Sequence, residues 1–563
     1  MSDDPFMAER RRKAEALAAL GLPVYNVDFR PDHTLEEAHR GLVDWEGGEP
    51  PGDAPGPEVA VAGRLMLHRI QGRSVFSHLE DESGRMQVWF RQDQLGEPAF
   101  EAVKLLDLGD IVGVRGTLMR TRRGEPTVLV QALTPLVKAL RQPPEKFHGL
   151  QHQETRYRKR YYDLMASVSQ RRHFQTRAVL LRSVRRTLEE RGFLEVETPI
   201  LQLIPGGGHA VPFRTHWNAL HADVYLRIAI ELHLKRLLVG GYRRVYEIGR
   251  VFRNEGLSPR HNPEFTMLEA YQAYADYADM RELTEAIVVD AARAIPAAPR
   301  GAVEMEESEG DARDGAAAPG VPDVPAAPDV RAAAGRPEAR TAAGAPDAPA
   351  AAGAPASLVD PLRRQYGGRD LDLSPPFPAR TMASLIEDVC GFDPVRAWDG
   401  GTLEERARQA GVELPAGLGP GTIFNEVYEQ KVERTLHDPT FVLDYPAEVS
   451  PLARRRRDDP RFVERFELVI AGRELANAFS ELNDPIDQRA RFEEQARRRE
   501  LEEGVGHPLD EDFLEAIEAG MPPAGGLGVG LDRLAMLLTD SPGIRDVLLF
   551  PTMRPQGGEE AEV

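Results

Sequence analysis

Residues 296–357 are the part of the chain that most limits how it can fold. They include runs such as VPDVPAAPDVRAAAGRPEAR and contain no aromatic residue, leucine or isoleucine. A segment with so few large apolar side chains cannot bury enough surface to offset the conformational entropy lost on folding. We therefore expect a disordered surface insertion without a catalytic role. The folded domains must then be formed by the sequence on its two sides.

The remaining composition is that of a multidomain protein. A chain of 563 residues is too long for one hydrophobic core, and 42% apolar residues are ample for several. The formal net charge of −20 argues against a nucleic-acid partner at first sight. However, acidic residues gather in EMEESEGD and in the last residues, while RYRKRYYD and other clusters are basic. Net charge alone therefore decides little about partners.

The sequence also indicates where the protein works. No apolar run of about 18 residues is present, so we expect no membrane span. The N-terminal residues lack the apolar core of a secretory signal. The single cysteine, Cys390, excludes an internal disulfide framework. Together these features predict a cytoplasmic protein.

Short alternating runs predict an N-terminal β domain. Residues 1–58 are expected to hold a helix near 7–20 and a linker rich in glycine and proline. From 59 to 142, runs such as VAVAGRLML and IVGVRGTLM alternate apolar and polar residues between turns. Their size and rhythm favour a five-stranded oligonucleotide-binding (OB-fold) barrel. A barrel that serves only as a spacer fits the pattern equally well.

The larger domain is predicted to be α+β. Residues 143–163 are expected to link it to the barrel, and residues 164–556 to form it around the insertion, before an acidic tail at 557–563. Its first helical pattern leads into an extended EVETPIL, and later strands alternate with helices without a βαβ rhythm. An antiparallel sheet flanked by helices is therefore favoured over a doubly wound parallel one.

Three separated segments carry the chemistry. RGFLEVETPIL (191–201) runs from a helix end into a strand, and GGLGVGLDRLAML (525–537) places glycines before a helix. Between them, VFRNEGLSPRHNPEFTMLEAY (251–271) predicts a hairpin that concentrates charge between two apolar strands. Each segment alone is a weak signal, because glycine-rich junctions often serve close packing only. Their order and their arginines make the set specific.

In this order the three segments resemble motifs 1, 2 and 3 of the class II aminoacyl-tRNA synthetases. FRNEGLSPRHNPEFTMLEAYQAYADY, YPAEVSPLARR and ELANAFSELNDP are closely similar to bacterial lysyl-tRNA synthetases. The resemblance extends from about residue 59 onward, apart from the insertion. It implies a homodimer, joined through motif 1, that makes lysyl-adenylate and pyrophosphate from L-lysine and ATP. The enzyme would then transfer lysine to the 3′-end of tRNA(Lys).

That reaction brings two anions together, so it needs positive charge at the reacting phosphorus. Arg253 offers a planar fork that can contact both the α-phosphate and the amino-acid carboxylate. With Arg253, Arg533 is the second catalytic residue that the resemblance implies. The remaining ATP contacts implied in this way are Glu255 at the adenine amino group, Phe265 stacked on the ring, Arg533 on its other face, and His261 and Asn262 at the triphosphate.

Two further glutamates are candidate magnesium ligands. Mg²⁺ takes oxygen ligands, commonly one or two carboxylates together with substrate phosphates. Glu467 and Glu474 would face one pocket if they lie on adjacent antiparallel strands joined at AGR. The resemblance implies that they bind ATP through this metal, which would neutralise and orient the phosphates.

The amino acid can be argued from charge. Glu231, Glu269 and Glu481 form an acidic candidate lining, and an amine-bearing side chain is its natural complement, since an unpaired buried carboxylate is unfavourable. The resemblance implies the full set of lysine contacts: Glu231 and the Gly207 backbone at the α-amine, Arg253 at the carboxylate, Tyr271 and Glu481 at the ε-ammonium with Glu269 in support, and Asn477 and Phe479 along the stem.

The resemblance also assigns the barrel to the anticodon. Such a domain reads splayed bases by stacking and by contacts to their edges. Phe76, Gln87 and Glu125 match the positions that do this in the family.

Several residues depart from the family pattern, among them Ile230, where proline is usual, and His68, where the barrel often has an arginine. Gly208 and Val211 change the loop after IPGG, which is expected to make that loop more mobile. Ala476 and Ala478 replace glycines beside Asn477. A methyl group in a close-packed pocket floor would weaken lysine binding unless small shifts absorb it.

Two other interpretations compete with that of a lysyl-tRNA synthetase. A paralogue that lysylates an elongation factor would resemble the catalytic domain alone, so residues 59–140 weigh against it. An inactive synthetase-like tRNA-binding protein would be expected to have lost Arg253, Glu474 or Arg533, and this chain keeps all three.

Overall fold

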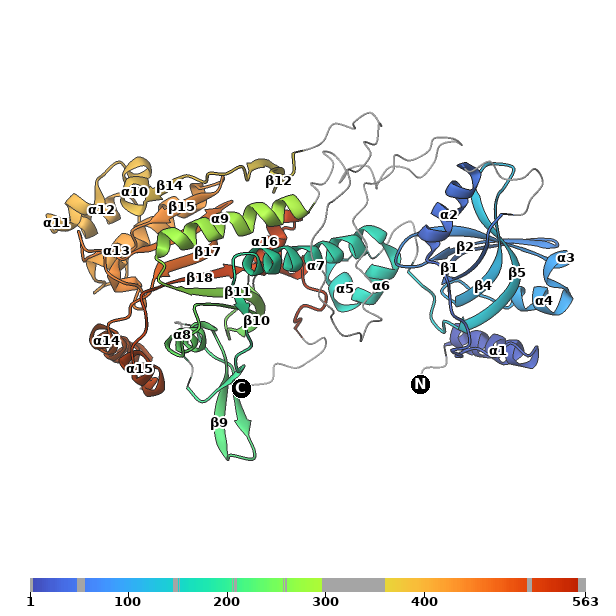
Figure 1. Cartoon of the computed structure of the whole chain (residues 1–563), viewed down its shortest axis with the longest axis horizontal. Coiled ribbons are helices and arrows are strands. Elements are labelled where there is room, and N and C mark those ends of the chain that lie inside the picture. The colour runs from blue at the N-terminus through green and yellow to red at the C-terminus, as the bar shows by residue number, and fades with distance from the viewer. Residues whose placement is uncertain are drawn as a thin grey trace, which may run out of the picture.

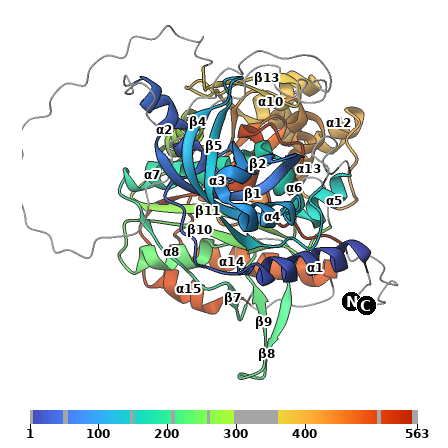
Figure 2. The ribbon, with the colours of Figure 1, turned by 90° about the vertical axis from the view of Figure 1, so that its right-hand side faces the viewer.

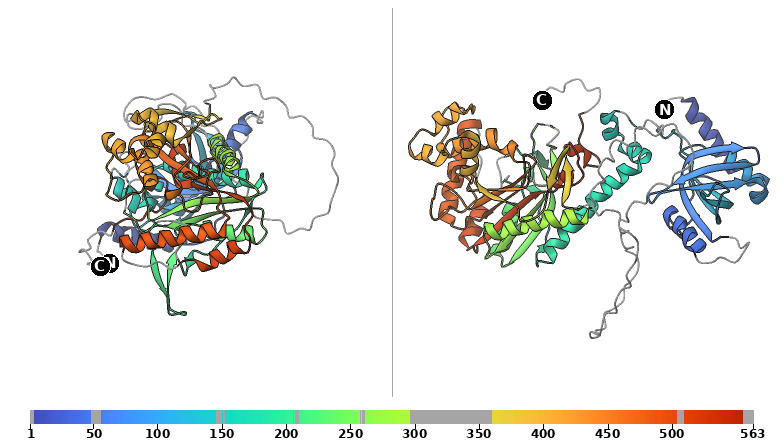
Figure 3. Two further views of the ribbon diagram at one scale, coloured as in Figure 1. Left: turned by 90° about the vertical axis from the view of Figure 1, so that its left-hand side faces the viewer. Right: turned by 90° about the horizontal axis from the view of Figure 1, so that it is seen from above.

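The computed structural model describes residues 4–47, 56–144, 150, 152–204, 206, 210–256, 258, 261–295, 360–503 and 509–554. The predicted insertion at 296–357, together with Gly207 and Gly208, lies outside the described residues. Within the described part of the chain, no helix is long and apolar enough to cross a membrane. The barrel lies at one end of the long axis and the large sheet at the other (Figures 1 and 3).

The N-terminal strands close into the predicted barrel. Its strand order is β1-β2-β3-β5-β4, in which β3 and β5 pair in parallel and the other pairs are antiparallel. Apolar side chains alternate inward along β2 and β3, so the period-two pattern fills one core. The strands are β1 (Glu58–Gln71), β2 (Ser74–Glu80), β3 (Arg85–Arg91), β4 (Ile111–Arg120) and β5 (Pro126–Val137). The accompanying helices are α1 (Pro5–Ala19), α2 (Leu35–Gly47), α3 (Gln92–Leu95) and α4 (Glu97–Lys104).

The second domain is built on an eight-stranded sheet, as the α+β prediction requires. Its order is β14-β15-β16-β17-β18-β11-β10-β6, and only the two edge pairs are parallel. The long strands of this sheet are therefore antiparallel throughout. The strands are β6 (Leu194–Glu195), β10 (Arg244–Phe252), β11 (Glu264–Ala273), β14 (Ala379–Thr381), β15 (Thr440–Leu443), β16 (Arg465–Ile470), β17 (Arg473–Ser480) and β18 (Ala524–Gly530).

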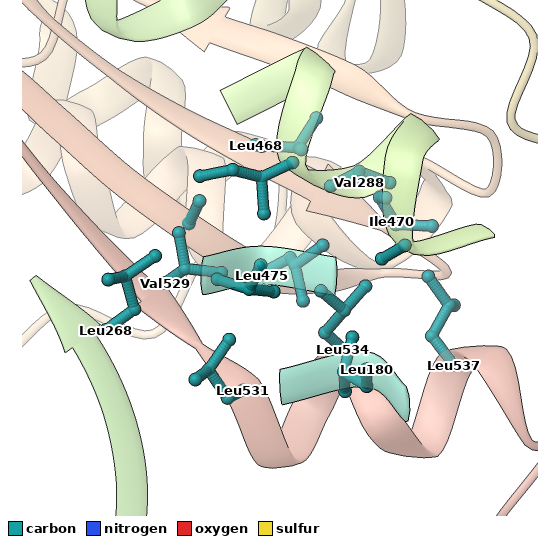
Figure 4. Packing of buried hydrophobic residues seen from close by; sticks show 14 of the residues in the cluster. Leu180, Leu268, Val288, Leu468, Ile470, Leu475, Val529, Leu531, Leu534 and Leu537 are labelled. Atoms are coloured by element: carbon teal, nitrogen blue, oxygen red, sulfur yellow. The ribbon is translucent and has the colours of Figure 1, made fainter. Parts of the chain in front are cut away.

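Three helices cover one face of this sheet. They are α7 (Val168–Glu189), α9 (Tyr277–Ala294) and α16 (Leu531–Leu538). Leu180 of α7, Val288 of α9 and Leu534 of α16 are all fully buried in one cluster with apolar residues of the sheet (Figure 4). Because this face is filled by the core, the substrate site must use the opposite face.

Smaller elements complete the domain. The segment predicted as a linker contains two short helices, α5 and α6, which lead into α7. A hairpin of β8 and β9 projects from the body (Figure 2). The elements are α5 (Gln153–Arg158), α6 (Arg160–Ala166), α8 (Glu231–Val239), α10 (Met382–Cys390), α11 (Pro394–Asp399), α12 (Leu403–Gln409), α13 (Pro420–Val427), α14 (Pro485–Glu503), α15 (Glu511–Glu518), β7 (Leu201–Gln202), β8 (Arg214–Trp217), β9 (Ala222–Leu226), β12 (Arg363–Tyr366) and β13 (Arg369–Asp372).

One buried arginine joins the chain on both sides of the insertion. Arg364 of β12 donates from Nη2 to the carbonyl oxygens of Ala292, at 2.5 Å, and of Ile295. Its Nη1 donates to the carbonyl oxygen of Leu538 at 3.1 Å. The end of α9, the start of β12 and the end of α16 are therefore held together by one side chain.

Candidate active site

The site face of the sheet is shaped by the glycines of β18. Gly526 pairs with Phe479 of β17 on one side and Tyr271 of β11 on the other. Gly528 pairs in the same way with Asn477 and Glu269. Paired residues point to the same face of a sheet, and glycine has no side chain to fill it. The middle strand therefore leaves a trough between two strands that bear functional side chains.

Of the two glycines that pair on both sides in the trough, Gly526 tolerates a side chain less well. A Cβ placed there would overlap the carboxylate of Glu481 and would lie 2.5 Å from Cε1 of Tyr271. At Gly528 the nearest atom would be the mobile end of Met267, Cε, at 3.0 Å. The close packing at Gly526 brings Glu481 against the floor of the trough.

A cavity of about 340 Å³ occupies this trough. Most of the predicted site residues line it, and they come from the hairpin, α8, β17 and the start of α16. Those in the lining are Glu231, Arg253, Glu255, His261, Asn262, Phe265, Glu269, Tyr271, Glu474, Asn477, Phe479 and Arg533. Glu467 and Glu481 lie next to lining residues rather than in the lining itself. Gly207 lies outside the described residues.

The hairpin of β10 and β11 presents the cationic part of the cavity. The backbone N–H of Arg253 donates to the carbonyl oxygen of Pro263 at 2.9 Å, which closes the charged turn. The Arg253 guanidinium lies over the Phe265 ring, with Cζ 5.2 Å from the centroid. Its Nε is buried and has no hydrogen-bond partner among the described residues. Such a donor fits an anionic ligand.

Two more lining residues sit on the same loop. Nδ1 of His261 lies 2.9 Å from Oγ of Ser258. Asn262 donates from its side-chain nitrogen to the carbonyl oxygen of Glu264 at 2.7 Å, while its side-chain oxygen is buried without a partner among the described residues.

The candidate magnesium ligands lie on adjacent strands, as their spacing suggested. β16 and β17 pair antiparallel, and Ala471 and Gly472 form the turn between them with φ of 52° and 66°. Two positive φ values in a two-residue loop are typical of a tight hairpin. Glu467 pairs in register with Asn477, and Glu474 with Val469. Both glutamates therefore project from the same face.

Both glutamates also have arginine partners. Arg465 donates from Nη2 to Glu467 at 2.5 Å, and Arg533 forms an ion pair with Glu474 at 3.3 Å. Burial, and then the neighbouring charge of Glu474, raise the pKa of Glu467 to about 7. Two neighbouring carboxylates, of which one has a raised pKa because of the other's charge, fit a divalent cation chemically. The described residues contain no group of three or more His, Cys, Asp or Glu arranged to hold a metal by themselves.

The other part of the cavity is acidic. The Glu269 carboxylate accepts hydrogen bonds from the Ile230 backbone at 2.9 Å and from the Tyr271 hydroxyl at 3.0 Å. Burial, and then Glu231, raise the pKa of Glu269 to about 7. Burial also raises the pKa of Glu481 to about 8, although Lys235 opposes that shift. This part of the site strongly disfavours uncompensated negative charge.

Two residues that sequence analysis did not single out support the site. Asp532 accepts a hydrogen bond from the Thr266 backbone at 2.8 Å and pairs with Arg177 at 2.5 Å, so it links α7 to the cavity. Lys235 is fully buried and pairs with Glu231 at 2.6 Å. Lys235 follows Glu231 by four residues on one helix, and this spacing predicts that the two side chains pair. No comparable local pattern marks Asp532.

The two alanines that replace family glycines lie elsewhere than expected. Ala476 and Ala478 are buried in the core on the helix-covered face, with Leu468 and Leu527, and neither lines the cavity. Strand alternation explains this, because Asn477 between them faces the trough. The expectation that their methyl groups lie in the pocket floor is therefore wrong. Val211 is exposed, and its carbonyl oxygen accepts a hydrogen bond from the Asn254 backbone at 2.7 Å.

The barrel carries a second candidate surface. Phe76 stacks on Trp89 of the neighbouring strand, with centroids 5.1 Å apart and planes 16° apart. Gln87 donates to Glu125 at 2.9 Å. Phe76 and Gln87 therefore lie on neighbouring strands of one barrel face, and Glu125 lies in the turn before β5. Trp89, which sequence analysis did not single out, lies beside them on β3.

Comparisons with known proteins agree with this geometry. The family model "tRNA synthetases class II (D, K and N)" matches residues 152–554, and the model "OB-fold nucleic acid binding domain" matches residues 59–136. The chain therefore belongs to the class II tRNA synthetases of the D, K and N group.

Individual relatives show which member of this group the chain resembles. The chain is 46% identical to a lysine–tRNA ligase of Moorella thermoacetica over 99% of both chains. It is 44% identical to a lysine–tRNA ligase of Enterococcus faecalis over 97% of both chains. It is 43% identical to that of Bacillus subtilis over 97% of this chain and 96% of the relative. Within its class, the chain is a member of the lysine–tRNA ligase family.

The close approach at Gly526 generates a stability prediction. We expect Gly526→Ala to lower the free energy of unfolding by about 1–3 kcal/mol, because the methyl group must displace Glu481 or Tyr271. Gly528→Ala is the matched control and should change it by less than about 0.5 kcal/mol, since Met267 can move aside. Denaturant unfolding of both variants measures the difference. Equal losses at the two positions would contradict this account of the trough.

Proposed function

We propose that this chain is a lysine–tRNA ligase that activates L-lysine with ATP and transfers it to the 3′-end of tRNA(Lys). One observation carries the proposal: a single cavity joins the arginines of motifs 2 and 3 to a cluster of buried glutamates. A nucleotide and a diamino acid are the ligands whose charges these two parts complement. The lysine–tRNA ligase relatives, aligned over nearly the whole chain, support the same function.

In the first step, a carboxylate oxygen of lysine attacks the α-phosphorus of ATP and pyrophosphate leaves. Arg253 has the role of holding both anions, since its guanidinium is planar and its buried Nε has no partner among the described residues. Phe265, under that guanidinium, provides an aromatic face for the adenine ring. Arg533 has the role of stabilising charge on the phosphates, and the start of α16 fixes its position.

Glu467 and Glu474 are the residues that would hold Mg²⁺. Their shared face, the raised pKa of Glu467 beside Glu474 and the oxygen chemistry of carboxylates support this assignment. When bound, the metal supplies charge neutralisation for the β- and γ-phosphates. Arg465 and Arg533, which pair with these carboxylates, keep them oriented.

The acidic cluster selects lysine rather than aspartate. A side-chain carboxylate would meet Glu231 and Glu269 in the lining, and like charges in a buried site repel strongly. The two ammonium groups of lysine would instead offset the charge of the glutamates. In the second step, the terminal 3′-hydroxyl of tRNA attacks the adenylate carbonyl and AMP leaves. The stacked Phe76 and Trp89, beside Gln87 and Glu125, suit splayed anticodon bases.

We further propose that the protein is a homodimer. Leu194, Ile200, Leu201 and Leu203 are large apolar residues that are exposed within one short segment at β6 and β7. β6 is also an edge strand of the large sheet. Exposed apolar patches and unpaired edges mark interaction sites, and this segment is motif 1. A translation enzyme with a single cysteine suits the reducing cytoplasm.

Amino-acid-dependent exchange of labelled pyrophosphate into ATP tests the function. We expect exchange with lysine and none above background with the other nineteen amino acids. Glu481→Gln should raise the KM for lysine about tenfold or more and the KM for ATP less than about twofold. Exchange with aspartate or asparagine alone would contradict the proposed specificity. Exchange with no amino acid would favour a tRNA-binding protein without activity.

The raised pKa values of Glu269 and Glu481 generate a pH prediction. Both carboxyls are partly protonated near neutral pH before lysine binds, and a bound ammonium favours their ionised form. Binding therefore releases protons, so affinity should weaken as pH falls through 8 and 7, by up to about tenfold per pH unit for each proton. Calorimetric titration in buffers of different ionisation enthalpy counts the protons. Glu481→Gln should release fewer, and a pH-independent affinity without proton release would refute the prediction.

Light scattering of the purified protein tests the dimer. We expect twice the mass of one chain, and a mass shifted toward one chain for the double variant Leu201→Asp/Leu203→Asp, because two charges would enter an apolar interface. Ile486→Asp is the control, since Ile486 is an exposed apolar residue outside motif 1. A wild-type mass of one chain would contradict the dimer.

A further inference from the structure

Lys235 occupies an unusual place beside the amino-acid pocket. It lies on α8, and its side chain is 0% exposed. Its Nζ lies 2.6 Å from Oε1 of Glu231 and also pairs with Glu481. The same atom lies 5.5 Å from the centroid of the Phe479 ring, which lines the cavity. One internal ammonium therefore contacts two of the glutamates assigned to the substrate, although Lys235 itself does not line the cavity.

This contact is more than a pair along a helix surface. An exposed Glu–Lys pair four residues apart contributes little, because water screens it. Here both partners are buried, and the lysine also reaches Glu481, which follows β17 and is far away in sequence. Burial alone would lower the pKa of Lys235, but Glu231 and Glu481 outweigh it and raise that pKa above its ordinary value. Lys235 therefore stays charged.

The charges of this cluster do not cancel. When Glu231, Glu269 and Glu481 are all ionised, as a bound cation favours, three carboxylates stand against the single ammonium of Lys235, which leaves an excess of two negative charges. L-Lysine carries two ammonium groups, and Arg253 is available for its carboxylate. The excess equals the positive charge that a diamino acid brings.

A buried cluster in the barrel gives the contrast. Lys138 is also 0% exposed, and it pairs with Asp107 at 2.6 Å and Asp110 at 2.8 Å. Lys13 pairs with Asp107 at 2.6 Å, so two lysines balance two aspartates. In this structural cluster of the barrel the charges are matched, whereas those of the ionised pocket cluster are not.

We propose that Lys235 is a positioning and specificity residue: it neutralises one of three pocket carboxylates, fixes Glu231 and Glu481, and leaves two negative charges for the two ammonium groups of the substrate. The proposal rests on the proposed lysine-dependent function. Lys235 does not touch the reacting atoms, so it acts through the two glutamates. Without it, a third buried carboxylate would have no partner in the complex and would have to take up a proton.

Pyrophosphate exchange by the full chain, with separate KM values for lysine and ATP, tests this role. In Lys235→Met, which keeps a long unbranched side chain without the charge, the KM for lysine should rise about tenfold or more. The KM for ATP should change less than about twofold, because the nucleotide contacts remain. Lys235→Arg, which keeps the charge, should recover most of the lysine affinity. Lys138→Met is the matched control and should lower thermal stability while leaving the KM for lysine within about twofold.

The outcomes separate this proposal from the proposed function. Wild-type protein that does not exchange with lysine refutes the function itself, whatever the variants do. If the wild type exchanges with lysine, a parallel rise of both KM values in Lys235→Met, or a Lys235→Arg variant as impaired as Lys235→Met, would overturn the role of Lys235. If Lys235→Met does not fold, Lys235→Gln is compared with Lys235→Arg in the same way. If neither folds while Lys235→Arg is active, the charge serves folding only and the proposal is wrong.

Discussion

The absence of side chains on the site face of β18, where Gly526 and Gly528 lie, is the constraint on which the site depends. Each neighbouring strand bears large groups on the same face, and a side chain at Gly526 would overlap Glu481. Because the opposite face is filled by α7, α9 and α16, the sheet can be both a packed core and a binding surface. The glycines of motif 3 thus leave the space that the side chains of motif 2 and of β17 need on this face.

The charges of the lining residues divide the trough into a cationic part and an acidic part. The Arg253 guanidinium over Phe265 and the Arg533–Glu474 pair suit a nucleotide, whereas Glu231 and Glu269 suit cations. A buried carboxylate is tolerated only with a partner, so the acidic part is stable in an ionised form only when cations enter it. Under the proposed function, specificity for lysine comes from an imbalance of charge that the fold holds in place, as well as from the shape of the pocket.

Much of the secondary structure was predictable from the sequence, because local alternation of apolar and polar residues encodes it. Alternation predicted the five-stranded barrel, and the hairpin of residues 251–271 formed at the predicted place. Alternation also carried the information that Ala476 and Ala478 point away from Asn477, although the pocket floor had been expected to contain them. The partnership of Lys235 with Glu481 is different. It joins a helix to a distant strand end, and no local pattern encodes that contact.

Arg364, which joins the two sides of the insertion, has a consequence for engineering the protein. Arg364 ties the end of α9 to the start of β12 through backbone carbonyls, so the two ends stay in place by contacts of their own. The entropy of closing a flexible loop grows only slowly with its length. The length of the segment between these two ends therefore has only a small effect on the free energy of unfolding. This makes the segment a suitable place for grafting a fluorescent or affinity tag.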